Sequence, residues 1–308
     1  MQSKVAKRSI WSGFKSSWQL YVLLIPAVAW LVTFAYYPLY GLVIAFKDYQ
    51  IRAGILQSPW ADPFFKYFSQ FFSTSIALQS IRNTLVLSLE SLVFAFPVPI
   101  IFALLLNQIK RDKVKKVIQT ISYAPYFVSN VVVVSLITVL FSANGVVNRA
   151  AVSLGGQETL FTSLPEWFRG LFIGSNIWQT MGFNAVIFIA ALTAISPEYY
   201  EAATIDGATR MQKILHIDLP LILPTIILML ILAAGNIMNI GYEKAFLMQN
   251  GSNTVVSELI STYVYKVGLQ TAQYSFATAV GLFNSIANFV ILAIANQVAK
   301  KTSNLSIF

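Results

Sequence analysis

The stretch YEAATIDGATRMQKILHIDLPLILP, residues 200–224, is a polar passage in an otherwise apolar chain. The segment FNAVIFIAALTAI comes shortly before it, and LILPTIILMLILAAG overlaps its end and continues. Alanine, glycine and aspartate recur in it at short intervals between two runs long enough to cross a bilayer. The stretch therefore reads as the connection between two membrane helices, and the rest of the chain has to be interpreted around it.

The composition of the chain is that of a polytopic membrane protein. Of its 308 residues 56% are hydrophobic and only 11% are charged, whereas soluble domains typically carry about 25% charged residues. In a soluble protein the net charge of +9 would suggest a nucleic-acid partner. In a membrane protein the positions of the charges along the chain matter more, and nucleic acid is not an expected partner. Cysteine is absent, which excludes disulfides, thiol catalysis and cysteine–metal sites.

Six apolar stretches predict six transmembrane helices, at 20–46, 84–106, 117–141, 171–195, 221–241 and 276–298. Lipid offers the backbone no hydrogen-bond partner and the chain lacks the alternating pattern of a barrel, so the fold class is all-α. Segment 250–273 is too polar to span and is expected to be an external loop or short helix. The expected organisation is an N-terminal tail at 1–19, a membrane domain at 20–298 and a C-terminal tail at 299–308.

The distribution of Lys and Arg predicts the orientation of the chain. With a cytoplasmic N-terminus, 13 of the 21 basic residues fall on the inside, most densely in NQIKRDKVKK at 107–116. The positive-inside rule then places both termini in the cytoplasm. The protein is expected to be a multi-pass component of the cell inner membrane. Segment 200–224 is cytoplasmic in the same arrangement.

Local signals in the polar passage predict a helix–turn–helix bracket, which we define as residues 196–220. Ser196 fits an N-cap and Pro197 the first helical position. Asp206 and Gly207 form a turn signal, 208–217 can form a second short helix, and Asp218 can cap the fifth membrane helix. Local pattern alone fits a solvated connecting loop equally well.

The bracket resembles the coupling-loop motif of binding-protein-dependent ABC import permeases: E-A-A, two residues, D-G-A, five residues, F, two residues, I, one residue, L-P. The one departure is Ile214 where the family usually has Phe. The resemblance implies the type I importer permease fold, with the bracket docked on a separate ATPase subunit, Glu201 at the contact and Gly207 permitting the bend. The implied coupling residues are Glu201, Ala202, Ala203, Asp206, Gly207, Ala208, Ile214, Ile217, Leu219 and Pro220.

Other segments resemble the sugar-import branch of that family. RNTLVLSLESLVFAFPVPIIFALLLNQI at 82–109 looks like its second-span signature, and YAPYFVSNVVV at 123–133 resembles the members that import oligosaccharides and polysaccharide fragments. The alginate importer of Gram-negative bacteria belongs there. The resemblance implies an oligo- or polysaccharide cargo, with alginate as one candidate. It also implies a second permease in a heterodimer, two ATPase subunits carrying ATP and Mg, and an extracytoplasmic solute-binding protein.

No phosphate-binding G-x-x-x-x-G-K-[ST] motif occurs in the chain, so energy is expected from a partner and this subunit is not expected to be an enzyme or to hold a cofactor. His216 is the single histidine, and a metal site is not expected. Glu90, within the second span, is interpreted as a structural partner rather than a proton carrier.

Polar and aromatic residues within or beside the spans are candidates for the translocation path, because amides bond sugar hydroxyls in both directions and rings stack on sugar C–H faces. Hydrogen bonding between helices explains such residues equally well. We expect Asn236 with Asn239, and Asn284 with Asn288, to share helix faces. The candidates are Asn176, Trp178, Gln179, Asn184, Asn236, Asn239, Tyr242, Asn284 and Asn288.

For a polyanionic cargo, Arg82, Lys244 and Lys266 are expected to matter at the outer mouth. Three alternatives stay open at this point: an ABC permease for a non-sugar solute, an ion-coupled secondary transporter, and a membrane scaffold. A secondary transporter predicts internal repeats or more intramembrane acids, which the sequence lacks.

Overall fold

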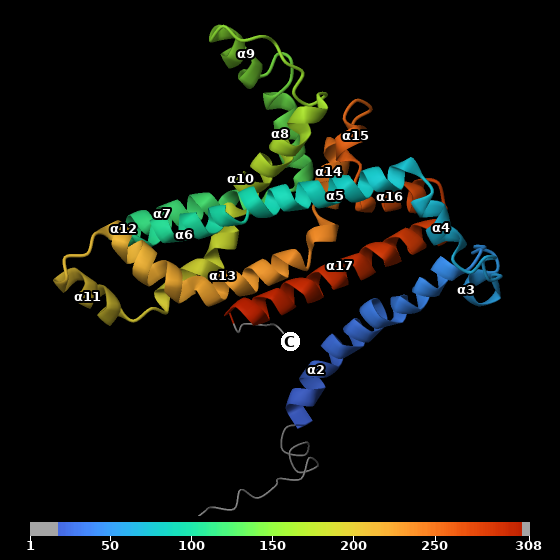
Figure 1. The fold of residues 1–308 in the computed structure, drawn as a ribbon, viewed down its shortest axis with the longest axis horizontal. Coiled ribbons are helices and arrows are strands. Elements are labelled where there is room, and N and C mark those ends of the chain that lie inside the picture. Colours follow the sequence, from blue (N-terminus) through green and yellow to red (C-terminus); the bar gives the residue numbers. More distant parts are fainter. Residues whose placement is uncertain (1–17, 304–308) are drawn as a thin grey trace, which may run out of the picture.

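The computed structural model describes residues 18–303, and within that range every regular element is helical apart from one isolated bridge between Lys47 and Trp60. Four helices there are long and apolar enough to cross a membrane, and there are six spans if each of two bent helix pairs counts as one. The helices form an elongated bundle with α11 and α12 at one end and α3, α4, α15 and α16 at the other (Figure 1). The all-α class predicted from composition is confirmed.

The first span runs from Trp18 to Phe46 as α2 (Trp18–Leu31), a π-helical turn (Val32–Tyr36) and a 3-10 segment (Tyr37–Phe46). No residue of its first two parts is buried. The helix leaves the bundle, and its N-terminal end stands apart from the other spans (Figure 1). Only its last part packs closely, against α17 (Tyr274–Ser303).

The second span is longer than the sequence predicted. It consists of α5 (Ser75–Phe94) and α6 (Pro97–Asn107), a single run of 33 residues. Two short helices, α3 (Gly54–Gln57) and α4 (Lys66–Phe72), precede it. Beside them, hydrogen bonds from Lys66 and Tyr67 lower the pKa of Asp48 below its ordinary value, which favours its ionised form.

The continuous helix predicted at 117–141 is wrong. The chain forms α7 (Asp112–Tyr123), a 3-10 turn (Ala124–Phe127) and α8 (Asn130–Leu140), and α7 and α8 meet at 96°. Pro125 disfavours a continued helix, and Ser129 starts a new one by accepting a 3.4 Å hydrogen bond from the Val132 amide. α9 (Val146–Ser153) follows.

The fourth span, α10 (Pro165–Thr193), is the hub of the bundle and packs against α6, α7 and α13. It crosses α7 at Gly182, where an added Cβ would lie 2.1 Å from the Ser122 carbonyl oxygen. Next to that contact Tyr126 and Phe183 stack with ring centroids 3.9 Å apart. The absence of a side chain at Gly182 therefore permits the crossing.

The fifth membrane helix begins and ends earlier than predicted. α12 (Arg210–Lys213), a π-helical turn (Ile214–Asp218) and α13 (Leu219–Ala234) form one helix, and a 3-10 turn (Ile237–Asn239) follows. Next come α14 (Tyr242–Met248), α15 (Thr254–Ser257), α16 (Ile260–Tyr265) and a π-helical turn (Lys266–Gln270). α15, α16 and this turn lie in segment 250–273, which was predicted as an external loop or short helix. The last span, α17, extends to Ser303.

A hydrophobic cluster joins the ends of three spans beneath the bracket. It contains Ile100, Ala103 and Leu104 of α6, Ala185, Phe188 and Leu192 of α10, and Ile222 of α13. Ile214 and Leu219 pack against it. The bracket is therefore anchored to α6, α10 and α13 together.

Candidate coupling surface and substrate cavity

The first limb of the bracket is α11 (Pro197–Ile205), which meets α10 at an angle of 71°. Ser196 caps it by accepting a 3.4 Å hydrogen bond from the Glu198 amide. α11 ends at Ile205, and the chain turns at Gly207, whose φ of +73° is the left-handed conformation that glycine adopts without a Cβ penalty. The Ala208 amide then closes the turn on the Ala203 carbonyl oxygen at 2.8 Å. The turn predicted at Asp206 and Gly207 is confirmed.

The second limb differs from the prediction. Thr209 forms a reciprocal cap with Gln212, and from Arg210 the chain continues without a break into the fifth membrane helix. Asp218 is therefore inside a helix and is not its cap. The carboxylate is completely buried. It accepts hydrogen bonds from the Tyr200 hydroxyl at 2.5 Å and from the side-chain Nε2 of Gln108 at 3.0 Å. Burial and the bond to Asp218 raise the pKa of Tyr200 to about 12, so its hydroxyl stays protonated and donates.

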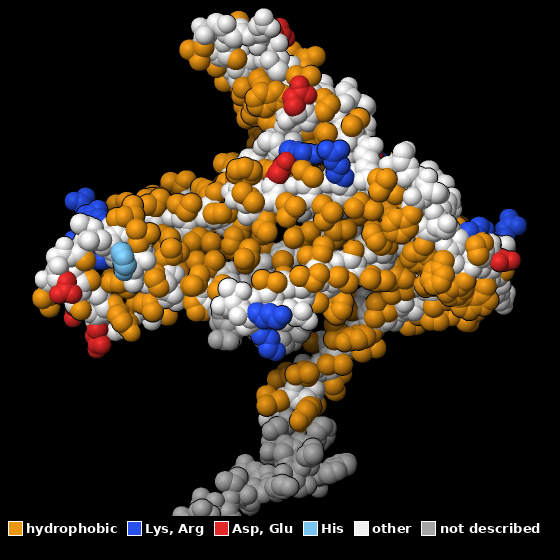
Figure 2. Space-filling model, viewed as in Figure 1, with side chains coloured by type: hydrophobic (Ala, Val, Ile, Leu, Met, Phe, Trp, Pro, Cys, Tyr) orange, Lys and Arg blue, Asp and Glu red, His pale blue; other side chains and the backbone are white. Residues whose placement is uncertain are grey.

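The outward face of the bracket is small and acidic. Glu201, Ala202, Asp206 and Gly207 are exposed, Ala203 and Ala208 are half-buried, and Ile205 is 87% exposed. Ile217 is half-buried and Pro220 is exposed. Acidic side chains gather with the single histidine at this end of the molecule, and basic ones lie beside them (Figure 2). Asp206, Gly207 and Ala208 place no large side chain in the turn.

A cavity of about 530 Å³ opens between α5, α6, α10 and the segment after α13. Asn176, Asn184, Asn236 and Asn239 line it, and none of its lining residues carries a charge. Ser88, Ser91 and Thr180 add hydroxyls. These three were missed from the sequence, although their polar side chains inside apolar spans were a usable signal.

The amides divide into two groups. Asn184, Asn236 and Asn239 are exposed towards the cavity. Asn288 instead accepts a 3.1 Å bond from the Met238 amide and donates to the Gly235 carbonyl oxygen, while Asn284 donates to Asn239 at 2.9 Å. Asn284 and Asn288 therefore fasten α17 to the end of α13 and do not line the cavity.

Asn236 and Asn239 do not share a helix face, because α13 ends at Ala234. Both nevertheless reach the cavity, since the chain turns there and carries the segment across its wall. The predicted shared helix face is therefore wrong for Asn236 and Asn239, although both residues line one cavity.

Three other path candidates lie elsewhere. Trp178 lines a separate apolar groove between α8 and α10. Gln179 is buried and links the Val128 carbonyl oxygen at 2.8 Å with the Lys244 ammonium at 2.8 Å. Tyr242 lines an open depression against α16 and α17. These positions do not contribute to the amide-lined cavity.

The charged side chains of Glu90, Lys244 and Lys266 have partners within the chain. Glu90 pairs with Arg169 at 3.3 Å, which agrees with a structural role. Lys244 is buried against Gln179, and Lys266 pairs with Glu258 at 2.5 Å. Of the three basic residues predicted at an outer mouth, only Arg82 is exposed.

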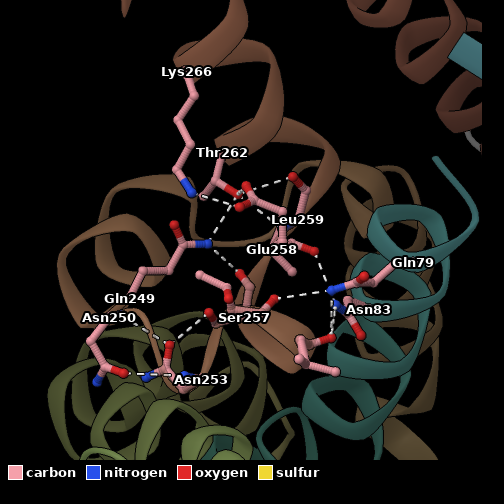
Figure 3. Close-up of polar contacts among 12 residues, drawn as sticks. Gln79, Asn83, Gln249, Asn250, Asn253, Ser257, Glu258, Leu259, Thr262 and Lys266 are labelled. Atoms are coloured by element: carbon pink, nitrogen blue, oxygen red, sulfur yellow. Dashed lines mark hydrogen bonds and ion pairs between the residues drawn. The ribbon is translucent and has the colours of Figure 1, made fainter. Parts of the chain in front are cut away.

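Lys266 belongs to a polar network that fastens the segment before α17 onto α5 (Figure 3). Asn83 donates to the carbonyl oxygens of Val255 and Glu258 at 2.9 and 3.1 Å. Thr262 donates to the Glu258 carboxylate at 2.8 Å. α15 and α16 are therefore held rigidly to the second span at the end of the molecule opposite the bracket (Figure 1).

No group of three or more potential metal ligands occurs among residues 18–303. His216 is exposed, and its Nδ1 lies 3.0 Å from the Gln212 carbonyl oxygen, one turn back on the same helix.

Comparison with known proteins identifies the family to which this chain belongs. Residues 95–304 match the family model described as binding-protein-dependent transport system inner membrane component. Protein LplB of Bacillus subtilis (strain 168) is 42% identical over 94% of this chain and 91% of its own length. The polygalacturonan/rhamnogalacturonan transport system permease protein YteP of the same organism is 41% identical over 94% of this chain and 90% of its own.

Solved structures agree with the sequence relatives. A chain of a bacterial ABC transporter involved in the import of the acidic polysaccharide alginate superposes with a TM-score of 0.87 and 39% identity, covering 96% of this chain and 99% of that one. A chain of a bacterial alginate ABC transporter in complex with alginate pentasaccharide-bound periplasmic protein gives 0.88 and 38%, covering 97% and 100%. The chain therefore belongs to the family of binding-protein-dependent transport system inner membrane components, the permease subunits of ABC transporters.

Proposed function

We propose that this chain is one of two permease subunits of an ATP-driven importer of oligo- or polysaccharide. The amide-lined cavity carries the proposal. The side-chain amides of Asn184, Asn236 and Asn239 can both donate and accept hydrogen bonds. They can therefore bond sugar hydroxyls that act either as acceptors or as donors. Each such bond contributes only about 0.5–1.5 kcal/mol net, so a sugar exchanges water for weak contacts and is not trapped.

Alginate is the acidic candidate for the cargo, supported by the two solved importers that this chain resembles at 38–39% identity. The cavity lining from this chain is uncharged. A uronate chain would therefore meet amides and hydroxyls here, and cationic partners for its carboxylates would come from elsewhere in the assembly, such as the second permease. A neutral oligosaccharide fits the same lining without such partners.

The energy for transport comes from a separate ATPase. The exposed, small and acidic face of α11 suits insertion into a cleft of that subunit, which would hold ATP and Mg. The bracket is then cytoplasmic, as are both termini, and the network around Glu258 is extracytoplasmic, where a solute-binding protein delivers the cargo. The full assembly is a permease heterodimer on two ATPase subunits in the cell inner membrane.

Purification of the intact complex tests this proposal. The tagged chain should co-purify with a second permease and an ATPase, and its binding protein should release an oligosaccharide detectable by mass spectrometry. Glu201→Lys should reduce ATPase recovery about tenfold while the permeases stay together. Recovery of a non-saccharide ligand would contradict the cargo, and full ATPase recovery with Glu201→Lys would contradict the docking surface.

A further inference from the structure

The buried carboxylate of Asp218 connects the bracket to two membrane helices. Asp218 lies where the fifth membrane helix emerges from the bracket, and its side chain is completely buried. Tyr200 of α11 donates to one of its oxygens at 2.5 Å. Gln108, the residue that ends α6, donates to the other at 3.0 Å.

The partners of this carboxylate are neutral. None of the three ion pairs within residues 18–303 includes Asp218. A buried carboxylate without a cation depends on its hydrogen-bond donors, because each unpaired oxygen would bear the full cost of desolvation. Tyr200 and Gln108 are therefore held at fixed positions on it, and neither can leave without a replacement donor.

The position of the contact gives it a mechanical consequence. Lys213 donates to Thr204 at 2.8 Å and ties the two limbs of the bracket together, while Ile214 and Leu219 pack on the cluster shared by α6, α10 and α13. The apolar packing allows sliding, whereas hydrogen bonds to one carboxylate fix distance and direction. Asp218 is the point where α11, α6 and the fifth helix are joined by directional bonds.

We propose that Asp218 is a positioning residue for coupling: it makes α11, the end of α6 and the start of α13 move as one body when the ATPase displaces the bracket. This rests on the proposed docking of α11 on an ATPase. We call the contact of Asp218 with Tyr200 and Gln108 the joint. If the joint transmits the motion, loss of the Tyr200 hydroxyl lets α11 move without carrying α6 with it. ATP hydrolysis then continues, but less saccharide is imported for each ATP hydrolysed.

The test uses the whole complex in proteoliposomes. Tyr200→Phe should leave assembly intact and raise the ATP hydrolysed per saccharide imported by about threefold to tenfold. Tyr199→Phe is the matched control, because this neighbouring tyrosine is 55% exposed and its hydroxyl has no hydrogen bond to the described residues. Asp218→Leu should uncouple more strongly, and Asp218→Asn, which keeps an acceptor for Tyr200, should stay closer to wild type.

A distance measurement separates the joint from a merely structural role. The chain contains no cysteine, so spin labels at Glu198→Cys on α11 and Leu105→Cys on α6 report on these helices alone. On addition of ATP the distance distribution should stay narrow in wild type and broaden in Tyr200→Phe. If Asp218→Leu fails to assemble, Tyr200→Phe decides alone, because it removes a single oxygen atom.

A wild-type ratio of ATP to saccharide in Tyr200→Phe overturns the joint, and so does an unchanged distance distribution. Failure of the proposed function looks different. If the cargo is wrong, the wild-type complex imports no saccharide, while the distances, which need only ATP and the ATPase, still test the joint. If the docking is wrong, ATP leaves the α11–α6 distances unaffected in every variant and Glu201→Lys has no effect on assembly.

Discussion

At the scale of single residues, the two groups of asparagines predict opposite phenotypes. Asn184 is exposed to the cavity and makes no side-chain hydrogen bond to the described residues. Asn184→Leu should therefore lower saccharide flux several-fold without lowering the thermal stability of the complex, since only contacts to the passing substrate are lost.

Asn288 should behave in the reverse way. Its amide satisfies the Met238 amide and the Gly235 carbonyl oxygen, and a buried backbone group without a partner costs about 1–3 kcal/mol. Asn288→Leu should lower the melting temperature of the detergent-solubilised complex, measured by tryptophan fluorescence, more than Asn184→Leu does. Equal stability of the two variants would remove the distinction between cavity and fastening amides.

Gly207 makes a prediction of the same scale. Its φ of +73° costs a residue with a side chain about 1–2 kcal/mol, although no atom lies within 4 Å of an added Cβ. Gly207→Val should destabilise the turn and lower the amount of ATPase that co-purifies, while membrane insertion stays unchanged. Gly251→Ala is the control, at an exposed glycine with open space and no positive φ. Wild-type ATPase recovery with Gly207→Val would show that the turn tolerates another conformation.

At the scale of elements, the crossing of α7 and α10 depends on Gly182. The Ser122 backbone lies where a Cβ would be, and overpacking typically costs about 1–3 kcal/mol. Gly182→Ala should lower the melting temperature of the complex, whereas Gly174→Ala, on the same helix with open space around it, should not. Equal melting temperatures would mean that the helices separate without cost.

Elements were predictable from the sequence where composition alone decides them, and not where tertiary contacts decide them. Apolar length located the four continuous spans and the two bent helix pairs, because lipid forces such residues into helices. Pro125 lies within the predicted third span, yet a proline permits either a kink or a complete turn, and its presence alone does not decide between them. Asp218 shows the same limit: its position favoured a cap, but its donors come from 18 and 110 residues away.

The site could be predicted in part for a related reason. The turn of the bracket follows from the local chemistry of Asp206 and Gly207, so the sequence contained it. Which amides face the cavity depends on where α13 ends. Gly235 and Asn236 in the run LILAAGNIMN favour a helix end after Ala234, but the span was predicted from apolar length, which continues to Gly241. Ser88 and Ser91 line the cavity because α5 presents that face to α10, which only the assembled bundle determines.

At the scale of the whole molecule, the orientation is open to a direct test. Lys113 in α7 and Val255 in α15 are both exposed. In cells whose outer membrane has been made permeable, an impermeant thiol reagent should label Val255→Cys and leave Lys113→Cys unlabelled until the inner membrane is opened. Labelling of Lys113→Cys in sealed cells would reverse the topology and place the bracket outside.

The central claim is that this permease passes saccharide through the amide-lined cavity when a separate ATPase hydrolyses ATP. The most direct measurement is saccharide uptake by the complete complex in proteoliposomes supplied with binding protein, with neutral and uronate oligosaccharides compared side by side. The account predicts ATP-dependent, vanadate-sensitive uptake of at least one of these saccharides, reduced several-fold by Asn184→Leu at unchanged ATPase content. Uptake of neither saccharide, or uptake that continues without ATP, would contradict it.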